Sequence, residues 1–234
     1  MLFRSHIQAT HAAYANRGMQ FEIQLGDKVA SLHTTTVGDY NVSNLTGVIA
    51  CLCALGQRLD DAVKACQALP PVPGRMELLG VAGEPLVIVD FAHTPDAIEK
   101  ALRAIQPLAA LRGGDIICVL GCGGNRDKAK RPLMAAVAET YAQQIVLTSD
   151  NPRLEDPEAI LRDMRVGLKA PQSARVVVDR AQAIAEAVQH AQQNDLVLIA
   201  GKGHETYQEI NDVKYPFSDQ LHAQQAIRNR SMHV

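Results

Sequence analysis

The 234-residue sequence has no tryptophan and only four phenylalanines, and it lacks any excess of basic side chains. It contains 23 lysine and arginine residues against 25 aspartate and glutamate residues, which gives a formal net charge of −2. Binding of nucleic acid by charge and base stacking requires basic patches and aromatic platforms. We therefore expect no nucleic-acid partner.

Patterns for disulfides, metals and membranes are also missing. The five cysteines are odd in number and form no Cys-x-x-Cys pair, and no His-x-x-x-His spacing occurs, so we expect reduced thiols and no metal site. The longest uninterrupted apolar run, residues 48–55, is far shorter than the about 20 residues that a membrane helix needs. The N-terminus carries no signal-peptide pattern. These absences predict a soluble cytoplasmic protein with no membrane partner.

The first third of the chain has the pattern of a small α/β segment. Apolar and polar residues alternate over 21–25, a Gly-Asp turn signal follows, and the apolar pattern resumes at 29–32, which predicts a β-hairpin. Apolar runs predict helices at 42–55 and 59–69.

The segment at 70–74, Pro-Pro-Val-Pro-Gly, predicts a boundary between a domain over 1–73 and a second domain over 74–234, because proline and glycine end regular structure. In the second domain, apolar runs predict strands at 86–89, 116–120, 145–148, 176–178 and 196–199. Continuous apolar runs are typical of parallel strands that are covered on both faces.

Helix start signals lie between these strands. A Thr-Pro pair at 94–95 and an Asp-Pro pair at 156–157 each offer a cap followed by proline in the first helical turn, and Asp179 with Gln182 resembles a capping box. Repeated strand–helix units with right-handed crossovers form a doubly wound, mostly parallel (Rossmann-like) α/β sheet. We predict this fold for the second domain.

Polar residues gather where four of these strands end. The loops concerned are Asp90-Phe91-Ala92-His93, Gly121-Cys122-Gly123-Gly124-Asn125-Arg126-Asp127, Asp150-Asn151-Pro152-Arg153 and Gly201-Lys202-Gly203-His204-Glu205. In open α/β sheets, ligands bind outside the carboxyl ends of the strands. Four such loops in register predict a small-molecule site at this edge of the sheet.

Two nucleotide-binding motifs are incomplete in these loops. Gly121-x-Gly123 resembles the start of a dinucleotide fingerprint, but Arg126 stands where that motif needs a small residue. The segment 201–205 lacks the Gly-x-x-x-x-Gly-Lys-Ser/Thr spacing of a phosphate loop, which occurs nowhere in the sequence. We interpret the basic residues at 128–131 as the solvent-exposed start of a helix.

The tetrapeptide at 150–153, Asp-Asn-Pro-Arg, has the groups that a zwitterionic amino acid needs. An arginine binds a carboxylate through two parallel hydrogen bonds, and an aspartate accepts from an ammonium group. Arg126 and Glu205 would suit a ligand with a second charged end. A surface turn with a capping aspartate is the alternative interpretation of the tetrapeptide.

Six segments, in order along the chain, resemble the Mur ligases of peptidoglycan synthesis. They are residues 38–44, 74–77, 90–95, 121–132, 150–153 and 201–205. The resemblance implies an ATP-dependent ligase. In that reaction ATP phosphorylates the side-chain carboxylate of D-glutamate in UDP-MurNAc-L-Ala-D-Glu, and the amine of a third amino acid then attacks the acyl phosphate.

Within that family, Asp-Asn-Pro-Arg marks members that select meso-diaminopimelate over lysine. The resemblance implies a pocket for this amino acid made of Arg126, Asp150, Asn151, Pro152, Arg153, Gly201 and Glu205. Diaminopimelate is lysine with an added carboxylate. A buried Arg153 left without that carboxylate would disfavour lysine by roughly 3–5 kcal/mol.

For ATP, the resemblance implies contacts by Asn41, Asn44, Arg75, Asp90 and His93. The phosphate loop, the ligands of Mg²⁺ and the catalytic residues are expected in a part of such ligases that precedes this sequence. Residues 1–73 would then be the C-terminal remnant of the central ATP-binding domain. We accordingly expect a C-terminal fragment that is inactive alone.

Two other functions stay open at this point. One is a related ligase, such as a folylpolyglutamate synthetase or the enzyme that adds D-Ala-D-Ala, although the tetrapeptide at 150–153 argues against it. The other is a non-catalytic module that binds an amino acid or a nucleotide.

Overall fold

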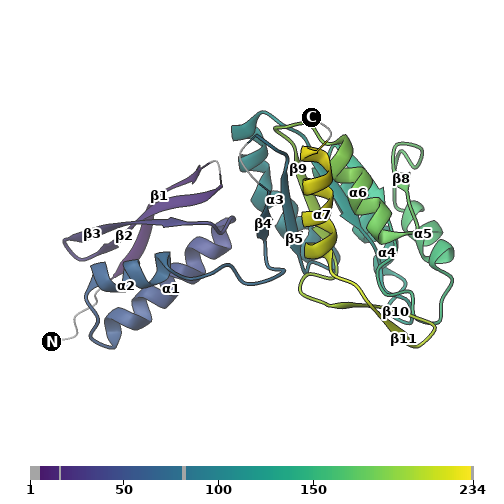
Figure 1. Cartoon of the computed structure of the whole chain (residues 1–234). Coiled ribbons are helices and arrows are strands. Elements are labelled where there is room, and N and C mark those ends of the chain that lie inside the picture. The colour runs from purple at the N-terminus through teal and green to yellow at the C-terminus, as the bar shows by residue number, and fades with distance from the viewer. Residues whose placement is uncertain (1–5, 16, 81–82, 233–234) are drawn as a thin grey trace. The chain divides into compact units, whose positions relative to one another are not determined.

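The computed structural model describes residues 6–15, 17–80 and 83–232. The chain divides into two compact units, Met1–Pro71 and Val72–Val234. The division falls within the proline-rich segment. Figure 1 shows a small sheet with two helices in the first unit and a larger sheet covered by helices in the second.

The first unit is an antiparallel sheet packed against two helices. Strands β1 (Ile7–Ala15), β2 (Gly18–Leu25) and β3 (Lys28–Thr34) are followed by helices α1 (Asp39–Ala54) and α2 (Leu59–Gln67). The predicted hairpin is confirmed as β2 and β3, and both predicted helices form. The sequence does not predict β1, because most of its side chains are exposed or half-buried and show no regular alternation.

The second unit is built on a sheet that has six strands within the described residues, in the order β4-β5-β9-β6-β7-β8. β4 is antiparallel to β5, and the other neighbouring strands are parallel. The strands are β4 (Glu77–Leu79), β5 (Leu86–Asp90), β6 (Ile116–Leu120), β7 (Gln144–Leu147), β8 (Arg175–Val176) and β9 (Leu196–Ala200). Every residue of β6 and β9 is buried, as expected for parallel strands covered on both faces.

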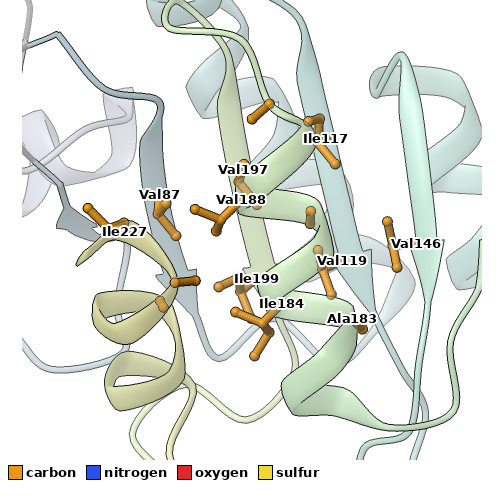
Figure 2. Close-up of a cluster of buried hydrophobic side chains, with 14 of the residues drawn as sticks. Val87, Ile117, Val119, Val146, Ala183, Ile184, Val188, Val197, Ile199 and Ile227 are labelled. Atoms are coloured by element: carbon orange, nitrogen blue, oxygen red, sulfur yellow. The ribbon is translucent and has the colours of Figure 1, made fainter. Parts of the chain in front are cut away.

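Helices cover this sheet in two groups (Figure 1). α3 (Pro95–Arg112) packs against α4 (Lys130–Tyr141), which packs against α5 (Pro157–Arg165), while α6 (Arg180–His190) packs against α7 (Asp219–Ser231). Figure 2 shows the core between α6, α7 and one face of the sheet, where alternate valines and isoleucines of the strands meet alanines and isoleucines of the helices. The intervening strand residues are equally buried on the other face. The predicted doubly wound, mostly parallel fold is confirmed.

Three of these helices begin where the sequence predicts. Their N-cap side chains, Thr94, Asp156 and Asp179, each accept a hydrogen bond from a backbone N–H in the first turn. Such a bond satisfies a donor that has no partner inside the helix and contributes about 1 kcal/mol. These caps fix the points where the chain turns away from the carboxyl edge of the sheet.

Parts of the second unit differ from the expectation. The strand predicted at 176–178 is shortened to β8, an exposed edge strand that pairs with β7 alone among the described strands. A hairpin of β10 (Tyr207–Ile210) and β11 (Val213–Pro216) follows β9, and it leads into α7. The sequence does not predict the hairpin, because its side chains are exposed or half-buried and carry no apolar pattern.

Arg131 also corrects the sequence interpretation, since it is fully buried rather than part of an exposed helix start. Its Nη1 donates to Asp163 Oδ2 at 2.8 Å, and its Nη2 donates to both carboxylate oxygens of Glu155 at 3.0 Å. The hydrogen bond from Arg131 lowers the pKa of Glu155 to about 2. This ion pair ties the start of α4 to the loop that follows β7.

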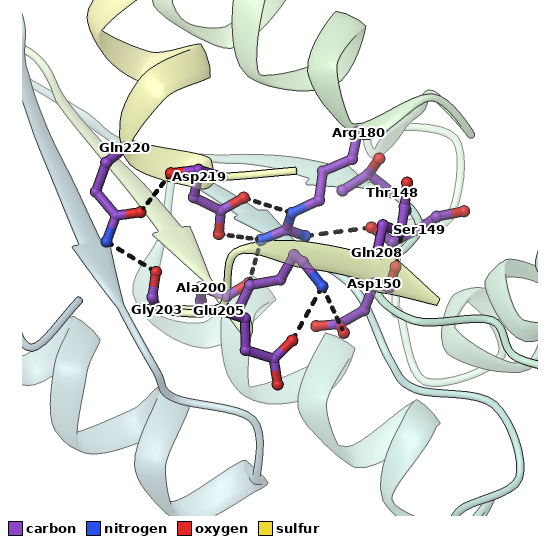
Figure 3. A network of polar contacts seen from close by, with 12 residues as sticks. Thr148, Ser149, Asp150, Arg180, Ala200, Gly203, Glu205, Gln208, Asp219 and Gln220 are labelled. Atoms are coloured by element: carbon purple, nitrogen blue, oxygen red, sulfur yellow. Dashed lines mark hydrogen bonds and ion pairs between the residues drawn. The ribbon is translucent and has the colours of Figure 1, made fainter. Parts of the chain in front are cut away.

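A second buried ion pair joins α6 to α7. The Arg180 and Asp219 side chains are completely buried, and Nε and Nη2 of Arg180 donate to the two carboxylate oxygens at 2.7 Å each (Figure 3). The same guanidinium donates to the carbonyl oxygens of Ser149 and Ala200, at the ends of β7 and β9. Two strand ends are thereby fixed to the two helices.

We predict that Asp219→Ala lowers the free energy of unfolding by about 3–5 kcal/mol, because Arg180 would stay buried without a counter-charge. Urea denaturation of the purified chain measures this. The control is Glu186→Ala, which removes the partner of the partly exposed Arg175 and is expected to change stability by less than about 1 kcal/mol. Equal effects of the two substitutions would contradict the prediction.

Candidate functional site

Four loops meet at the carboxyl edge of the sheet in the second unit. β5, β9, β6 and β7 are adjacent and parallel, so the residues that follow them emerge along one edge. The loops surround a cavity of about 280 Å³. The cavity is lined by Phe91, His93, Gly121, Cys122, Gly123, Arg126, Lys130, Asp150, Asn151, Arg153, Gly201 and Glu205.

Most of the residues assigned to the amino-acid pocket lie together in this cavity. Those that line it are Arg126, Asp150, Asn151, Arg153, Gly201 and Glu205. Pro152 is buried beside them and is not a lining residue. The structure thus brings these side chains together, and their roles in binding stay a prediction.

Close approach of the loops depends on glycine. Gly201 has φ +122°, and a Cβ atom there would lie 2.5 Å from Oδ2 of Asp150. A Cβ atom on Gly124 would collide with the carbonyl oxygen of Pro152. The loops after β6, β7 and β9 can therefore share one cavity because two of them lack a side chain at the points of contact.

Lys202 is completely buried and connects two of the loops. Its Nζ donates to Asn151 Oδ1 at 2.8 Å and to Glu205 Oε2 at 3.0 Å, and it lies 3.9 Å from Asp150 Oδ1. Asn151 Nδ2 donates to the same Glu205 oxygen at 2.9 Å. None of the contacts within the described residues engages Glu205 Oε1. One oxygen of this carboxylate is thus fixed, and the other is available to a ligand.

Arg153 already has an anionic partner in the protein. The sequence-based expectation is that only a ligand carboxylate neutralises its charge. Its Nε lies 3.2 Å from Oε2 of Glu209, and its Nη1 donates to Gly124 O at 2.9 Å. The two charged side chains are 19% and 21% exposed. The expectation fails because the sequence gives no sign that β10 brings Glu209 beside the loop.

The cavity carries charges of both signs. Arg126, Lys130 and Arg153 supply cationic groups, while Asp150 and Glu205 supply carboxylates. Arg126 is exposed and its Nη1 donates to Asn125 O at 3.2 Å, which leaves most of its donors to solvent or a ligand. Such a cavity suits a small molecule with more than one carboxylate and more than one ammonium group.

The residues assigned to ATP are divided between the units. Asn41 and Asn44 lie on α1 of the first unit, where Asn41 Nδ2 donates to Val37 O at 2.8 Å and Asn44 is exposed. Arg75, Asp90 and His93 belong to the second unit, and His93 lines the cavity of the amino-acid residues. These contacts stay predictions.

Arg75 and Asp90 are placed by the aromatic and backbone groups around them. The Arg75 guanidinium lies over the Phe91 ring, 4.9 Å from its centroid. Asp90 accepts hydrogen bonds from the backbone N–H groups of Met76 and Ala92 at 2.9 Å. Burial raises the pKa of the Asp90 carboxyl despite these bonds.

Several site residues lie outside the sequence-based set. Lys130, Phe91 and Cys122 line the cavity, and Lys202 and Glu209 hold lining residues from behind. Lys202 stands in a loop that the sequence already marks as polar, so it could have been found there. Glu209 lies in the unpredicted hairpin, and the sequence carries no signal for its role.

No group of three or more His, Cys, Asp or Glu residues is arranged to hold a metal ion in the part of the chain that the structure describes. Within those residues, too, no helix is long and apolar enough to cross a membrane.

Comparison with known proteins identifies the family. A family model described as "Mur ligase, glutamate ligase domain" matches residues 74–203, which is more than half of the chain. The chain belongs to the Mur ligase family. This confirms the resemblance carried by the six sequence segments.

The Mur ligase relatives include two curated proteins named UDP-N-acetylmuramoyl-L-alanyl-D-glutamate--2,6-diaminopimelate ligase. One, from Acidovorax sp. (strain JS42), is 52% identical over 226 residues, which cover 97% of this chain and 45% of the relative. The other, from Ralstonia nicotianae (strain ATCC BAA-1114 / GMI1000), is 46% identical over 228 residues, which cover 97% and 44%. The chain therefore spans about half the length of the curated relatives that it matches.

Solved structures of Mur ligases share the fold. A structure of a ligase with that same name superposes with a TM-score of 0.75 at 35% identity and covers 100% of this chain and 47% of the other. A folylpolyglutamate synthase from Thermotoga maritima has a TM-score of 0.64 at 18% identity, with coverage of 83% and 43%. At that identity the second likeness shows the fold alone.

The buried thiols of this Mur ligase chain yield a test of the site. Burial raises the pKa of Cys118 and of Cys122 to about 12, so on the order of one thiol in 10⁴ is ionised at pH 8. We predict that iodoacetamide at pH 8 alkylates the exposed Cys51 and spares Cys118 and Cys122. Mass spectrometry of the labelled peptides measures this, with the urea-unfolded chain as control. Rapid labelling of Cys122 in the folded chain would contradict the description of the cavity.

Proposed function

We propose that this chain is the amino-acid-binding part of an ATP-dependent ligase that adds meso-diaminopimelate to UDP-MurNAc-L-Ala-D-Glu in the synthesis of peptidoglycan precursors. One observation carries the proposal: a cavity with separate cationic and anionic groups, in a chain whose relatives are named as diaminopimelate ligases. Its substrates would be small molecules of the cytoplasm.

Diaminopimelate carries two carboxylates and two ammonium groups, which match the charges of the cavity. A guanidinium forms charge-assisted hydrogen bonds to a carboxylate, so Arg153 would bind the distal carboxylate through Nη2 and Arg126 would bind the other. Glu205 Oε1 and Asp150 would accept hydrogen bonds from the ammonium groups. The fixed positions of Asn151 and Glu205 support this arrangement, because neither needs to reorganise on binding.

Selection against lysine would be weaker than an unpaired arginine implies. Lysine lacks the distal carboxylate, but Arg153 keeps Glu209 as its partner and is not left as an isolated buried charge. The selectivity then comes from the charge-assisted hydrogen bonds that diaminopimelate adds. These are worth about 1.5–3 kcal/mol, or roughly 10- to 100-fold in affinity.

The contribution of this chain to the reaction would be positional. When an amine is held beside an activated carboxyl group, the two react as if they belonged to one molecule. Much of the translational and rotational entropy cost of bringing them together is then already met by binding. The described residues offer no cluster for Mg²⁺, and the sequence has no phosphate loop. We propose residues 1–73 as a C-terminal part of the ATP-binding domain. We also propose that five residues of the chain lie near ATP: Asn41, Asn44, Arg75, Asp90 and His93.

We predict that the purified chain binds meso-diaminopimelate weakly and that Arg153→Ala lowers this affinity at least about tenfold, because the distal carboxylate loses its charge-assisted partner. Isothermal titration calorimetry measures both. Arg162→Ala is the matched control, since it removes an arginine that is 65% exposed on α5. An unchanged affinity in Arg153→Ala would refute the assigned role, and absence of binding to the unaltered chain would refute the proposed substrate.

We also predict that the 234-residue chain alone forms no amide bond from ATP, UDP-MurNAc-L-Ala-D-Glu and meso-diaminopimelate, since its sequence has no loop to hold the phosphates. Mass spectrometry of the product and release of inorganic phosphate would both be followed. Formation of tripeptide without any added protein would overturn this prediction.

A further inference from the structure

β10 and the turn of the β10–β11 hairpin are hydrogen-bonded to the tetrapeptide at 150–153, from its first residue to its last. Gln208 Nε2 donates to Asp150 O at 2.7 Å, and the Glu209 backbone N–H donates to Asn151 Oδ1 at 2.9 Å. The Arg153 backbone N–H donates to Glu209 O at 3.0 Å, and Asn211 N–H donates to Arg153 O at 2.8 Å. The tetrapeptide therefore borders the hairpin like a short additional strand.

The Glu209 side chain contacts the cavity wall at Arg153, while its backbone N–H donates to Asn151 Oδ1. Its backbone and carboxylate both contact Arg153, yet it is not one of the residues that line the cavity. A side chain in this position cannot touch a ligand in the cavity directly. We therefore expect a change of this side chain to affect binding through the arginine.

The contacts of Arg153 engage its nitrogens unequally. Nε faces Glu209 Oε2 at 3.2 Å, and Nη1 donates to Gly124 O at 2.9 Å, with Asn151 O at 3.5 Å. Within the described residues, no hydrogen bond involves Nη2. Nη1 is therefore held by hydrogen bonds and Nε by the ion pair, and the N–H groups of Nη2 stay available to an anion.

Anchoring two nitrogens fixes the direction of the third. A free arginine side chain has several rotatable bonds and loses much conformational entropy when a ligand orders it. The pair with Glu209 is about four-fifths buried on both sides, so it is screened less than a surface pair. This order exists before any ligand binds.

We propose that Glu209 is a specificity-determining residue of this cavity, which positions the Arg153 guanidinium so that Nη2 meets the second carboxylate of the amino acid. The inference rests on the proposed binding of meso-diaminopimelate. It assigns Glu209 a positioning role, since it acts through Arg153 and does not touch the ligand. A ligand without a second carboxylate, such as lysine, gains nothing from this arrangement.

The test compares two substitutions at one position in the 234-residue chain. Glu209→Ala removes the carboxylate that lies 3.2 Å from Arg153 Nε, whereas Glu209→Gln keeps a polar side chain of the same length and removes the charge. Calorimetric titration with meso-diaminopimelate and with L-lysine gives the affinity ratio for each variant. Asp212→Asn is the matched control, because it removes one negative charge from the exposed turn of the same hairpin. Thermal unfolding checks that each variant is folded.

We expect Glu209→Ala to weaken diaminopimelate binding about tenfold, because Arg153 would lose roughly one charge-assisted hydrogen bond to the second carboxylate. Lysine binding should stay within about twofold. Glu209→Gln should restore most of the lost affinity, and Asp212→Asn should leave both affinities unchanged. A hairpin that merely supports the fold would lower both affinities together and would not distinguish alanine from glutamine.

Other results would overturn the inference. Unchanged or tighter diaminopimelate binding by Glu209→Ala would mean that Glu209 is neutral or competes with the ligand for Arg153. Equal loss in Glu209→Ala and Glu209→Gln would exclude positioning of Arg153 by a polar group at position 209. If the unaltered chain binds no diaminopimelate, the proposed function fails as well. If it binds and the Glu209 variants behave as the unaltered chain does, the function stands and this inference alone fails.

Discussion

The buried ammonium of Lys202 is the contact on which the geometry of the site depends. An ammonium group removed from water is unfavourable unless polar or anionic acceptors surround it. Its acceptors here are Asn151 and Glu205, which come from different loops. Lys202 fixes the Asn151 amide with Oδ1 toward itself, so Nδ2 is directed to Glu205. The charge that needs these acceptors therefore also sets their orientation, and two strand ends become one rigid surface.

A buried or half-buried counter-charge also supports Arg153, with the two signs reversed. Glu209 supports the cationic Arg153, as Lys202 supports the anionic Glu205. Arg153 and Glu205 thus each have a counter-charge behind them, and their loops can fold without a ligand to neutralise these two charges. The ion pairs of Arg131 and Arg180 extend this arrangement into the helices, because each ties a loop at the carboxyl edge to α4 or α6. Order at the cavity is therefore a property of the folded chain.

The sequence predicts the site to the extent that general rules of parallel sheets apply. Apolar runs locate the strands, and the rule that ligands bind at their carboxyl ends brings the loops at 121–127, 150–153 and 201–205 to one cavity. These rules do not locate the charged side chains that pair with the lining residues without lining the cavity themselves. Glu209 lies on a strand without an apolar pattern, and its partner lies far away in the sequence. Arg131 misleads for the converse reason: a basic run is usually exposed, and its partners Glu155 and Asp163 become visible only once α4 and α5 are packed together.

Backbone strain at Arg153 connects the hairpin to selectivity. Arg153 has φ 53°, a left-handed conformation that costs a residue other than glycine about 1–2 kcal/mol. Its backbone N–H and carbonyl both bond to the β10–β11 hairpin, at 3.0 and 2.8 Å, and these bonds offset the strain. The conformation that directs the guanidinium is therefore maintained by an element that does not line the cavity. Sequence changes in the hairpin can then alter the choice of amino acid while every lining residue stays the same, so a comparison of lining residues alone would miss such changes.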